Sequence, residues 1–301
     1  MKITDPIRIR VLTHNIRYAT ETPSKGEQKW EIRCSRLINE LCFSVRHCME
    51  SIICLQEALH RQLLDIIRAL NAEEDTWNYV GVGRDDGNEA GEFSPIIYRK
   101  DIWELKAHKT IWLSETPDVP SKSWDAASIR ILTIANFQHH ATRKTLIAMN
   151  THLDDQGSES RMKSAQIILE QIHAIASQNT DGKSLPIFLA GDFNSEPDQE
   201  AYKKITKAES PMIDLMLSVP ENKRYGDINT FTGFDTSETQ RQRIDFIFIN
   251  HKPSSEGDTL SGKNNPERHW QVEGFTVLPN RFEDEIYNSD HRAVIGDLLL
   301  T

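Results

Sequence analysis

The chain has 301 residues, of which 38% are hydrophobic and 27% charged, proportions typical of a globular protein with an ordinary apolar core. No apolar run is long enough to span a bilayer, and the first residues lack the apolar core of a signal peptide. The cytoplasm is therefore the default location, although a signal peptide that had been removed would leave no trace. The net charge of −10 disfavours a general nucleic-acid binder, because an acidic surface repels a polyphosphate backbone.

Short strand patterns recur along the whole chain. Residues 7–12 alternate apolar and polar side chains, which predicts a strand with one buried face. The runs 51–55 and 185–190 are apolar and predict buried strands. The same reasoning predicts further strands at 95–98, 131–137, 145–150, 244–249, 271–278 and 292–300.

Three stretches carry apolar side chains at intervals of three or four residues, which predicts amphipathic helices. They cover residues 30–48, 59–70 and 162–176. Many strands with a few interleaved helices indicate an α/β protein with stacked sheets. Because no stretch resembles an interdomain linker, we expect residues 1–301 to form one domain.

Two long segments have no regular pattern. Residues 111–128 predict a loop that carries Trp112 and Trp124, whose rings either line a functional cleft or cover an edge of the core. Residues 251–269 are polar and predict a solvated loop or a lid. The cysteines fall in one short window without a CxxC pair, so we expect no zinc site and no disulfide framework. We interpret them as small buried apolar residues of a helix and the following strand: Cys34, Cys42, Cys48 and Cys54.

Five predicted strands run directly into polar side chains that can bind a metal ion or a phosphate. The carboxyl ends of strands are where α/β proteins usually place ligand sites. A polar group buried there without a partner would cost about 2–7 kcal/mol, so we expect these ends to converge on one cleft. The segments are VLTHNIRY with Asn15, ICLQEAL with Glu57, IAMNTHLDD with His152 and Asp154, IFLAGDFNSEP with Asp192 and Asn194, and YNSDHRAV with Asp290 and His291.

Each motif alone also has a purely structural interpretation. Asn15 would make a turn hydrogen bond at a strand end, and Glu57 would suit the N-terminus of the following helix. His152 would be a core histidine, while GDFN and SDH would be polar turns beside strands. Asp245 differs, because a carboxylate inside an apolar strand is costly unless it is paired. His291 is its natural partner.

In this order the motifs resemble those of the endonuclease/exonuclease/phosphatase superfamily, which includes deoxyribonucleases, inositol-polyphosphate 5-phosphatases, sphingomyelinases and deadenylases. The succession GDFN, RIDFIF and SDH is its most specific part, and the resemblance extends from Asn15 to His291. It implies a four-layer α/β sandwich in which two mixed β-sheets pack face to face between helices. It also implies hydrolysis of a phosphoester by attack of water on phosphorus.

The resemblance assigns the metal and the attacking water to four residues. Glu57 would bind Mg²⁺ or Mn²⁺ directly, because these ions prefer oxygen ligands. Asn15 would lie at the same metal site, and Asp290 would complete or approach it. Asp192 would orient the attacking water and remove its proton.

Further motif residues would act on the phosphate. Asn194 would hold the phosphate or the water, and His152 would donate a hydrogen bond to the developing negative charge. Asp245 would pair with His291 and favour the imidazolium that contacts the phosphate. Arg17 departs from the pattern, because many family members carry an acidic residue or Asn at its position. Its guanidinium either reaches a substrate phosphate or makes a structural ion pair.

Two activities stay open on this basis. Hydrolysis of a small or lipid-like phosphoester is favoured by the acidic charge and the loop with its two tryptophans. The alternative is an endo- or exonuclease that acts on DNA or RNA, which needs a local basic surface. The complete motif set disfavours a scaffold without activity, and the lack of a G-x-S-x-G motif disfavours a serine hydrolase. The candidate basic residues for a nuclease are Lys203, Lys204, Lys207, Arg241 and Arg243.

Overall fold

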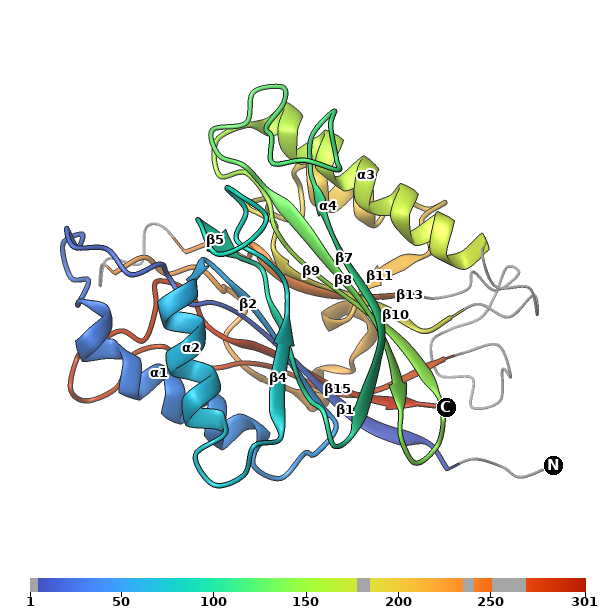
Figure 1. Cartoon of the computed structure of the whole chain (residues 1–301), viewed down its shortest axis with the longest axis horizontal. Coiled ribbons are helices and arrows are strands. Elements are labelled where there is room, and N and C mark those ends of the chain that lie inside the picture. The colour runs from blue at the N-terminus through green and yellow to red at the C-terminus, as the bar shows by residue number, and fades with distance from the viewer. Residues whose placement is uncertain (1–4, 178–184, 235–240, 251–268) are drawn as a thin grey trace.

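The computed structural model describes residues 5–177, 185–234, 241–250 and 269–301. Two mixed β-sheets lie face to face, and helices cover their outer faces (Figure 1). This arrangement confirms the four-layer α/β sandwich that the motifs implied. No described helix is long and apolar enough to cross a membrane.

The seven-stranded sheet has the order β12-β14-β15-β1-β2-β6-β4. At its centre β1 runs parallel to β2, with Asn15 beside Gln56, and antiparallel to β15. The carboxyl ends of β1 and β2 therefore lie at the same edge as the amino end of β15. The strands are β1 (Ile7–Asn15), β2 (Ser51–Gln56), β4 (Trp77–Val80), β6 (Ile96–Arg99), β12 (Arg224–Gly226), β14 (Trp270–Val277) and β15 (Val294–Leu300).

The six-stranded sheet has the order β11-β13-β10-β9-β8-β7. Its centre is a parallel pair, β9 and β10, with β13 antiparallel on the other side of β10. In this register Asp192 has His152 beside it on one strand and Asp245 on the other. The strands are β7 (Trp103–Trp112), β8 (Ile131–His139), β9 (Thr145–His152), β10 (Ile187–Asp192), β11 (Met212–Asp214) and β13 (Asp245–Asn250). A small separate ladder joins β3 (Ala58–Leu59) to β5 (Glu92–Phe93).

Within the described residues, four helices complete the layers, two on each outer face. Helices α1 (Trp30–Val45) and α2 (His60–Leu70) pack on the seven-stranded sheet. Helices α3 (Ser158–Ser177) and α4 (Glu200–Ile205) pack on the six-stranded sheet. Two 3₁₀ turns, Met216–Ser218 and Glu221–Lys223, follow β11.

The space between the sheets is apolar for most of its length and becomes polar at one end. Alternate residues of each strand face this space, and near the polar end these are Thr13, Gln56 and Asn150. The Asn150 Nδ2 donates to the carbonyls of Leu55 and Pro95 at 2.8 Å each, and Gln56 Nε2 donates to Asn150 Oδ1 at 2.7 Å. These fully buried bonds join the two sheets directly beneath the strand ends.

The structure corrects several boundaries predicted from the sequence. The first helix ends at Val45, so Cys48 lies beyond it, and only Cys54 of the four free cysteines is fully buried. The prediction of a loop at 111–128 is wrong at its start, because Ile111 and Trp112 end β7. This strand forms the edge of its sheet and has an exposed middle, so the sequence lacks a strong alternating pattern there. The other predicted loop, at 251–269, lies outside the described residues except for its last position.

Trp112 and Trp124 play different parts in the segment after β7. The buried ring of Trp112 donates from Nε1 to the carbonyl of Arg84 at 2.8 Å, which supports the interpretation that it covers an edge of the core. Trp124 is half-buried and has a left-handed backbone with φ 57°.

Candidate active site

The predicted site residues meet at the polar end of the space between the sheets. Asn15 ends β1, His152 ends β9, Asp192 ends β10 and Asp245 begins β13, while Glu57 follows β2 directly. Because side chains alternate along a strand, each of the four strand residues shares its face with the residues two and four positions away, which point into the space between the sheets. The convergence expected from the sequence is therefore produced by the strand registers. Asn194, Asp290 and His291 reach the same place from the turns after β10 and before β15.

Asp192 lies at the centre of this group. Its Oδ2 accepts a hydrogen bond from Asn15 Nδ2 at 2.9 Å and lies 3.5 Å from His152 Nε2 and 3.7 Å from His291 Nε2. Its Oδ1 accepts from the backbone N–H of Asn194 at 2.9 Å. Burial, together with the negative charge of Asp245, raises the pKa of the Asp192 carboxyl, which makes this carboxylate a better proton acceptor.

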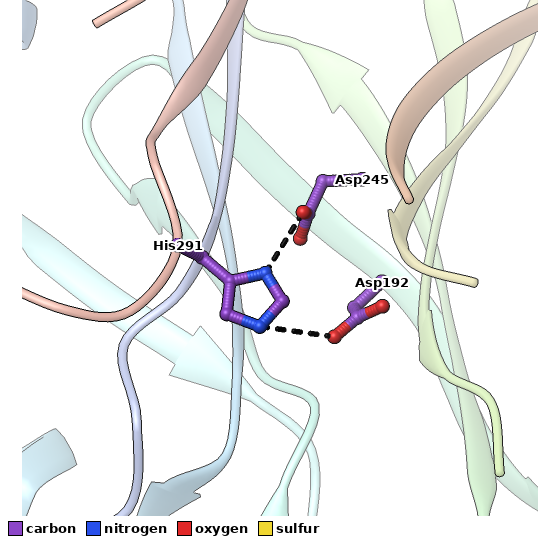
Figure 2. Close-up of side chains that lie close together, drawn as sticks. All are labelled: Asp192, Asp245 and His291. Atoms are coloured by element: carbon purple, nitrogen blue, oxygen red, sulfur yellow. Dashed lines mark hydrogen bonds and ion pairs between the residues drawn. The ribbon is translucent and has the colours of Figure 1, made fainter. Parts of the chain in front are cut away.

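Asp245 and His291 form a buried pair on one side of Asp192 (Figure 2). The His291 Nδ1 lies 2.9 Å from Asp245 Oδ2. Burial alone would lower the pKa of His291, but the charges of Asp245 and Asp192 raise it to about 10. The ring is therefore an imidazolium at neutral pH, and its Nε2–H points toward Asp192. The second oxygen of Asp245, Oδ1, has no hydrogen-bond partner among the described residues.

His152 lies on the other side of Asp192, and its ring is neutral where that of His291 is charged. Burial and the charge of Arg130 lower its pKa to about 4, so the ring is neutral at pH 7. The Asn194 amide donates to His152 Nε2 at 3.1 Å and to the Leu153 carbonyl at 3.0 Å. The opposite orientation of the Asn194 amide is disfavoured, because it would place the amide oxygen against the Leu153 carbonyl oxygen. Hence Nε2 accepts, and the ring proton resides on Nδ1, which lies 3.7 Å from Glu92 Oε2.

Glu57, Asn15 and Asp290 form an acidic corner beside Asp192. Asn15 Nδ2 donates to Glu57 Oε1 at 3.0 Å as well as to Asp192, so this amide links two carboxylates. Burial raises the pKa of Asp290, and the nearby carboxylate of Glu57 adds to the rise against the opposing charge of His291. A buried carboxyl whose pKa is raised by a neighbouring carboxylate is a chemical match for a divalent cation, because the cation relieves the repulsion between the two negative charges.

Arg17 makes the structural ion pair that was one of its two predicted roles. Its Nε donates to buried Glu27 at 3.1 Å, and its Nη1 lies 3.8 Å from Glu57 Oε2. The guanidinium also lies 4.3 Å from the centroid of the Tyr18 ring. Arg17 thus borders the acidic corner, where it offsets part of the negative charge.

Three site residues have left-handed backbone conformations that residues other than glycine rarely adopt. They are Arg17 with φ 55°, Glu57 with φ 57° and Asn194 with φ 45°. Strain of about 1–3 kcal/mol at each such residue persists only where the surroundings impose it. Because the three strained residues lie together, the strand ends are a place where the fold maintains backbone strain, as functional sites often do.

A second set of ligand atoms could also hold a cation. One side-chain atom each of Asp192, Asp245 and His291 lies within 4.8 Å of the others. However, the 2.9 Å contact between His291 and Asp245 is occupied by a proton when the ring is charged, and a cation beside an imidazolium is electrostatically disfavoured. Neither Glu57 nor Asp290 makes a hydrogen bond to a histidine ring among the described residues, although Arg17 Nη1 lies 3.8 Å from Glu57 Oε2.

Two residues at the site were missed in the sequence. Glu92 lies in the turn-rich segment, where nothing distinguishes it from other acidic residues. Arg33 lies in α1 and is buried; its guanidinium donates to the carbonyls of Ile16, Arg17 and Asn288 at 2.5–3.0 Å. It therefore ties the segment after β1 to the segment before β15. A charged residue within an amphipathic helix pattern gave no sign of this role.

Asp154 belongs to the framework of the site. It is fully buried, and its carboxylate accepts from the backbone N–H groups of Ala127, Ser128 and Gly157 at 2.7–3.1 Å. Burial opposes ionisation, but these bonds and Arg130 lower the pKa of Asp154 to about 2. The carboxylate therefore fixes the segment before β8 against the turn that follows His152.

One of the five basic residues considered for a nuclease cannot contribute to a basic surface. Arg243 is buried and pairs with buried Asp214 at 2.7 Å, so it cannot contact a nucleic acid. Arg241 also has a partner. Lys203 and Lys204 lie on helix α4, and Lys207 Nζ lies 3.8 Å from Glu209 Oε2.

Comparison with known proteins shows the family of the chain and agrees with the fold described above. A family model described as "Endonuclease/Exonuclease/phosphatase family" matches residues 12–268. A solved endonuclease/exonuclease/phosphatase structure from Bacteroides vulgatus superimposes with a TM-score of 0.79 at 33% identity, over 98% of this chain and 99% of that one. A mannosyl-6-phosphatase from Bacteroides thetaiotaomicron gives a TM-score of 0.78 at 29% identity, over 96% and 99%.

Nocturnin from Rattus norvegicus is a more distant relative. It is 26% identical over 150 residues, which are 49% of this chain and 32% of nocturnin. The match thus spans about a third of that relative's length.

Proposed function

Because the chain belongs to the endonuclease/exonuclease/phosphatase family, we propose that it is a divalent-metal-dependent hydrolase that releases phosphate from a small phosphorylated molecule by attack of water on phosphorus. The observation that carries this proposal is the position of Asp192, a buried carboxylate between a charged histidine and a neutral one. A proton acceptor and a fixed positive charge then lie within 4 Å of each other, as the attack of water on a phosphate requires.

Each side chain has a part in this chemistry. Asn15 holds the Asp192 carboxylate through one oxygen and the Asn194 N–H holds it through the other, so the proton acceptor cannot rotate. The amide protons of Asn194 are used by His152 and Leu153. Its oxygen is then left to accept a hydrogen bond from the attacking water. Asp192 takes the proton of that water as the new bond to phosphorus forms and the ester P–O bond breaks. The leaving oxygen takes a proton from solvent water and departs as the alcohol.

The developing negative charge on the phosphate is stabilised from the His291 side. The imidazolium offers Nε2–H, and Asp245 keeps both ring nitrogens protonated. Glu57 and Asp290 would hold Mg²⁺ or Mn²⁺, which supplies further positive charge to the phosphate oxygens. Asn15 orients Glu57 at this metal site. Arg17 offsets part of the negative charge of the acidic corner. Contact between Arg17 and a substrate phosphate, the second role expected from the sequence, belongs to the same proposal.

His152 acts through Asn194 in the state described. Because its Nε2 accepts a hydrogen bond, the donation to phosphate that the family motif implies needs the proton to move from Nδ1 to Nε2. Glu92 faces Nδ1 and would stabilise the ring while that exchange occurs.

A small phosphomonoester is favoured over nucleic acid as the substrate. The likeness to a mannosyl-6-phosphatase covers nearly the full length of both chains, and a net charge of −10 opposes a polyanionic strand. An endo- or exonuclease is the alternative, and of the five basic residues considered for it Lys203 and Lys204 on α4 have no acidic partner among the described residues.

The test is release of inorganic phosphate from mannose 6-phosphate and other hexose phosphates, with bis-p-nitrophenyl phosphate, plasmid DNA and RNA as competing substrates. Each is assayed with Mg²⁺, with Mn²⁺ and with EDTA. We expect metal-dependent turnover of a sugar phosphate and none of the nucleic acids. Turnover of DNA or RNA alone would support the alternative.

Two variants make the test specific to the site. Asp192→Asn removes the proton acceptor while it keeps the size of the side chain, and we expect turnover to be lost. Asp101→Asn changes an exposed carboxylate after β6, at the far end of the sheet, and turnover should be unchanged. If Asp192→Asn retained the wild-type rate, the proposed role of Asp192 would be wrong.

A further inference from the structure

An open hollow lies outside the proposed catalytic site, beside the seven-stranded sheet. It has a volume of about 1120 Å³, enough for a small organic ligand. The second half of α1 forms one wall, residues 222–225 form another, and β14 with residues 278–282 completes it. None of the proposed catalytic residues lines it. Glu40 separates the two regions, since it lines the hollow and accepts a hydrogen bond from Asn288 near the site.

The charge of the hollow is opposite to that of the chain. Five cationic and two acidic side chains line it, although the protein has a net charge of −10. Two of the cations are neutralised: Arg10 by Asp297 at 2.7 Å, and Arg36 by Asp284 at 2.5 Å.

Three cations are left without an acidic partner among the described residues. We call Arg46, Lys223 and Arg224 the cationic wall. Arg46 and Lys223 are exposed, and within the described part of the chain the Arg224 side chain donates to the carbonyl of Val219 alone. Unpaired cations on a concave surface raise the local concentration of anions.

Large aromatic side chains surround the same hollow. Phe43 is 76% exposed, Tyr225 is 71% exposed and Phe282 is 56% exposed, and we call these three the aromatic rim. They come from α1, β12 and the segment after β14, so three separate parts of the chain place an exposed ring at one opening. Exposed apolar side chains gathered in this way mark a binding surface.

We propose that the hollow binds a small anionic molecule that also carries an aromatic or other apolar group. Its phosphate, sulfate or carboxylate group pairs with the cationic wall, and its apolar part packs within the aromatic rim. A concave site of this volume suits a discrete molecule, whereas a flat or convex face would suit a membrane. The site is separate from the proposed phosphoesterase site and does not depend on its activity.

A pair of fluorescent dyes tests the proposal, because one carries the anion and the other does not. 1-Anilinonaphthalene-8-sulfonate is an aromatic anion, and N-phenyl-1-naphthylamine is its uncharged counterpart. We expect one sulfonate per folded chain. The double variant Arg46→Glu with Lys223→Glu should weaken sulfonate binding at least about tenfold and leave the neutral dye within about twofold. The double variant Tyr225→Ser with Phe282→Ser should weaken both dyes.

Two controls separate this site from others. Lys203→Glu reverses an exposed charge on α4, over the opposite sheet, and should leave sulfonate binding unchanged. Asp192→Asn should also leave it unchanged, because the catalytic site lies elsewhere. Circular dichroism must show that every variant is folded.

Three results would overturn the proposal. The first is equal sulfonate affinity in the wild type and in the charge-reversed variant. The second is loss of binding in Asp192→Asn, which would place the dye in the catalytic site. The third is sedimentation with anionic phosphatidylserine vesicles without binding of the soluble dye, which would make the surface a membrane face.

Discussion

The two histidines that face Asp192 differ in charge although both are buried. His291 is held beside Asp245 and has a pKa of about 10, while His152 lies near Arg130 and has a pKa of about 4. Burial acts in the same direction on both rings, so the difference comes from the sign of the neighbouring charge. One fold thus places a fixed cation and a neutral hydrogen-bonding ring on opposite sides of one carboxylate.

The largest expected effect is that of removing the cation. His291→Ala should lower kcat by about 10²–10³-fold, the range typical when one preorganised donor to a developing charge is lost. It also leaves Asp245 buried without its partner, which should lower the free energy of unfolding by about 1–3 kcal/mol. Steady-state kinetics and urea unfolding measure the two effects. A variant with wild-type kcat would show that the cation takes no part.

The second largest effect on activity is expected when the negative charge of Asp245, which keeps His291 protonated, is removed. In Asp245→Asn the pKa of His291 should fall from about 10 toward its ordinary value near 6.5. Because a raised pKa keeps the ring charged below that value, the wild type should stay charged from pH 5 to 9. The variant should lose charge as the pH rises through the neutral range, with activity about 30-fold lower at pH 8. A pH–rate profile identical to wild type would refute this coupling.

A third prediction concerns the support of the His152 side. The pKa of Asp154 is lowered to about 2, so its stabilising contribution is present above pH 4 and is lost as the pH falls toward 2. Asp154→Asn should therefore cost about 2 kcal/mol at neutral pH and remove part of the acid sensitivity. Thermal unfolding at pH 7 and pH 3 measures this change.

Asp155→Asn is the matched control, since this neighbouring side chain is half-exposed and its ion pair with Arg130 should contribute less than about 1 kcal/mol. Equal losses in the two variants would mean that the backbone bonds of Asp154 are unimportant.

The smallest effect is expected at the neutral ring. His152→Ala should lower kcat by about tenfold, as expected for the loss of one hydrogen bond that orients Asn194. His152→Asn keeps a neutral hydrogen-bonding group and should recover part of the rate. If His152→Ala reduced kcat as much as His291→Ala, the move of the proton from Nδ1 to Nε2 and a direct hydrogen bond to the phosphate would be part of the reaction, and a role through Asn194 alone would be wrong.

The sequence predicted that the motif residues lie close together better than it predicted the residues around them. The motif residues end strands, and the alternation of side chains along a strand carries Asn15, His152 and Asp192 to one face without further information. The contacts of Arg33 and Glu92 could not be predicted, because they join segments that only the packed layers bring together. Edge strand β7 was missed because its exposed middle has no apolar alternation, and Asp154 gave no sign that backbone groups would surround it.

The contrast between the two rings is tested most directly by nuclear magnetic resonance of protein labelled with ¹⁵N-histidine. The signals of the two rings are assigned by comparison with His152→Ala and His291→Ala, and the pH is varied from 5 to 9 with and without Mg²⁺. We expect both nitrogens of His291 to stay protonated throughout, and His152 to keep one unprotonated nitrogen, Nε2. Two rings that titrate together near pH 6.5 would contradict the account.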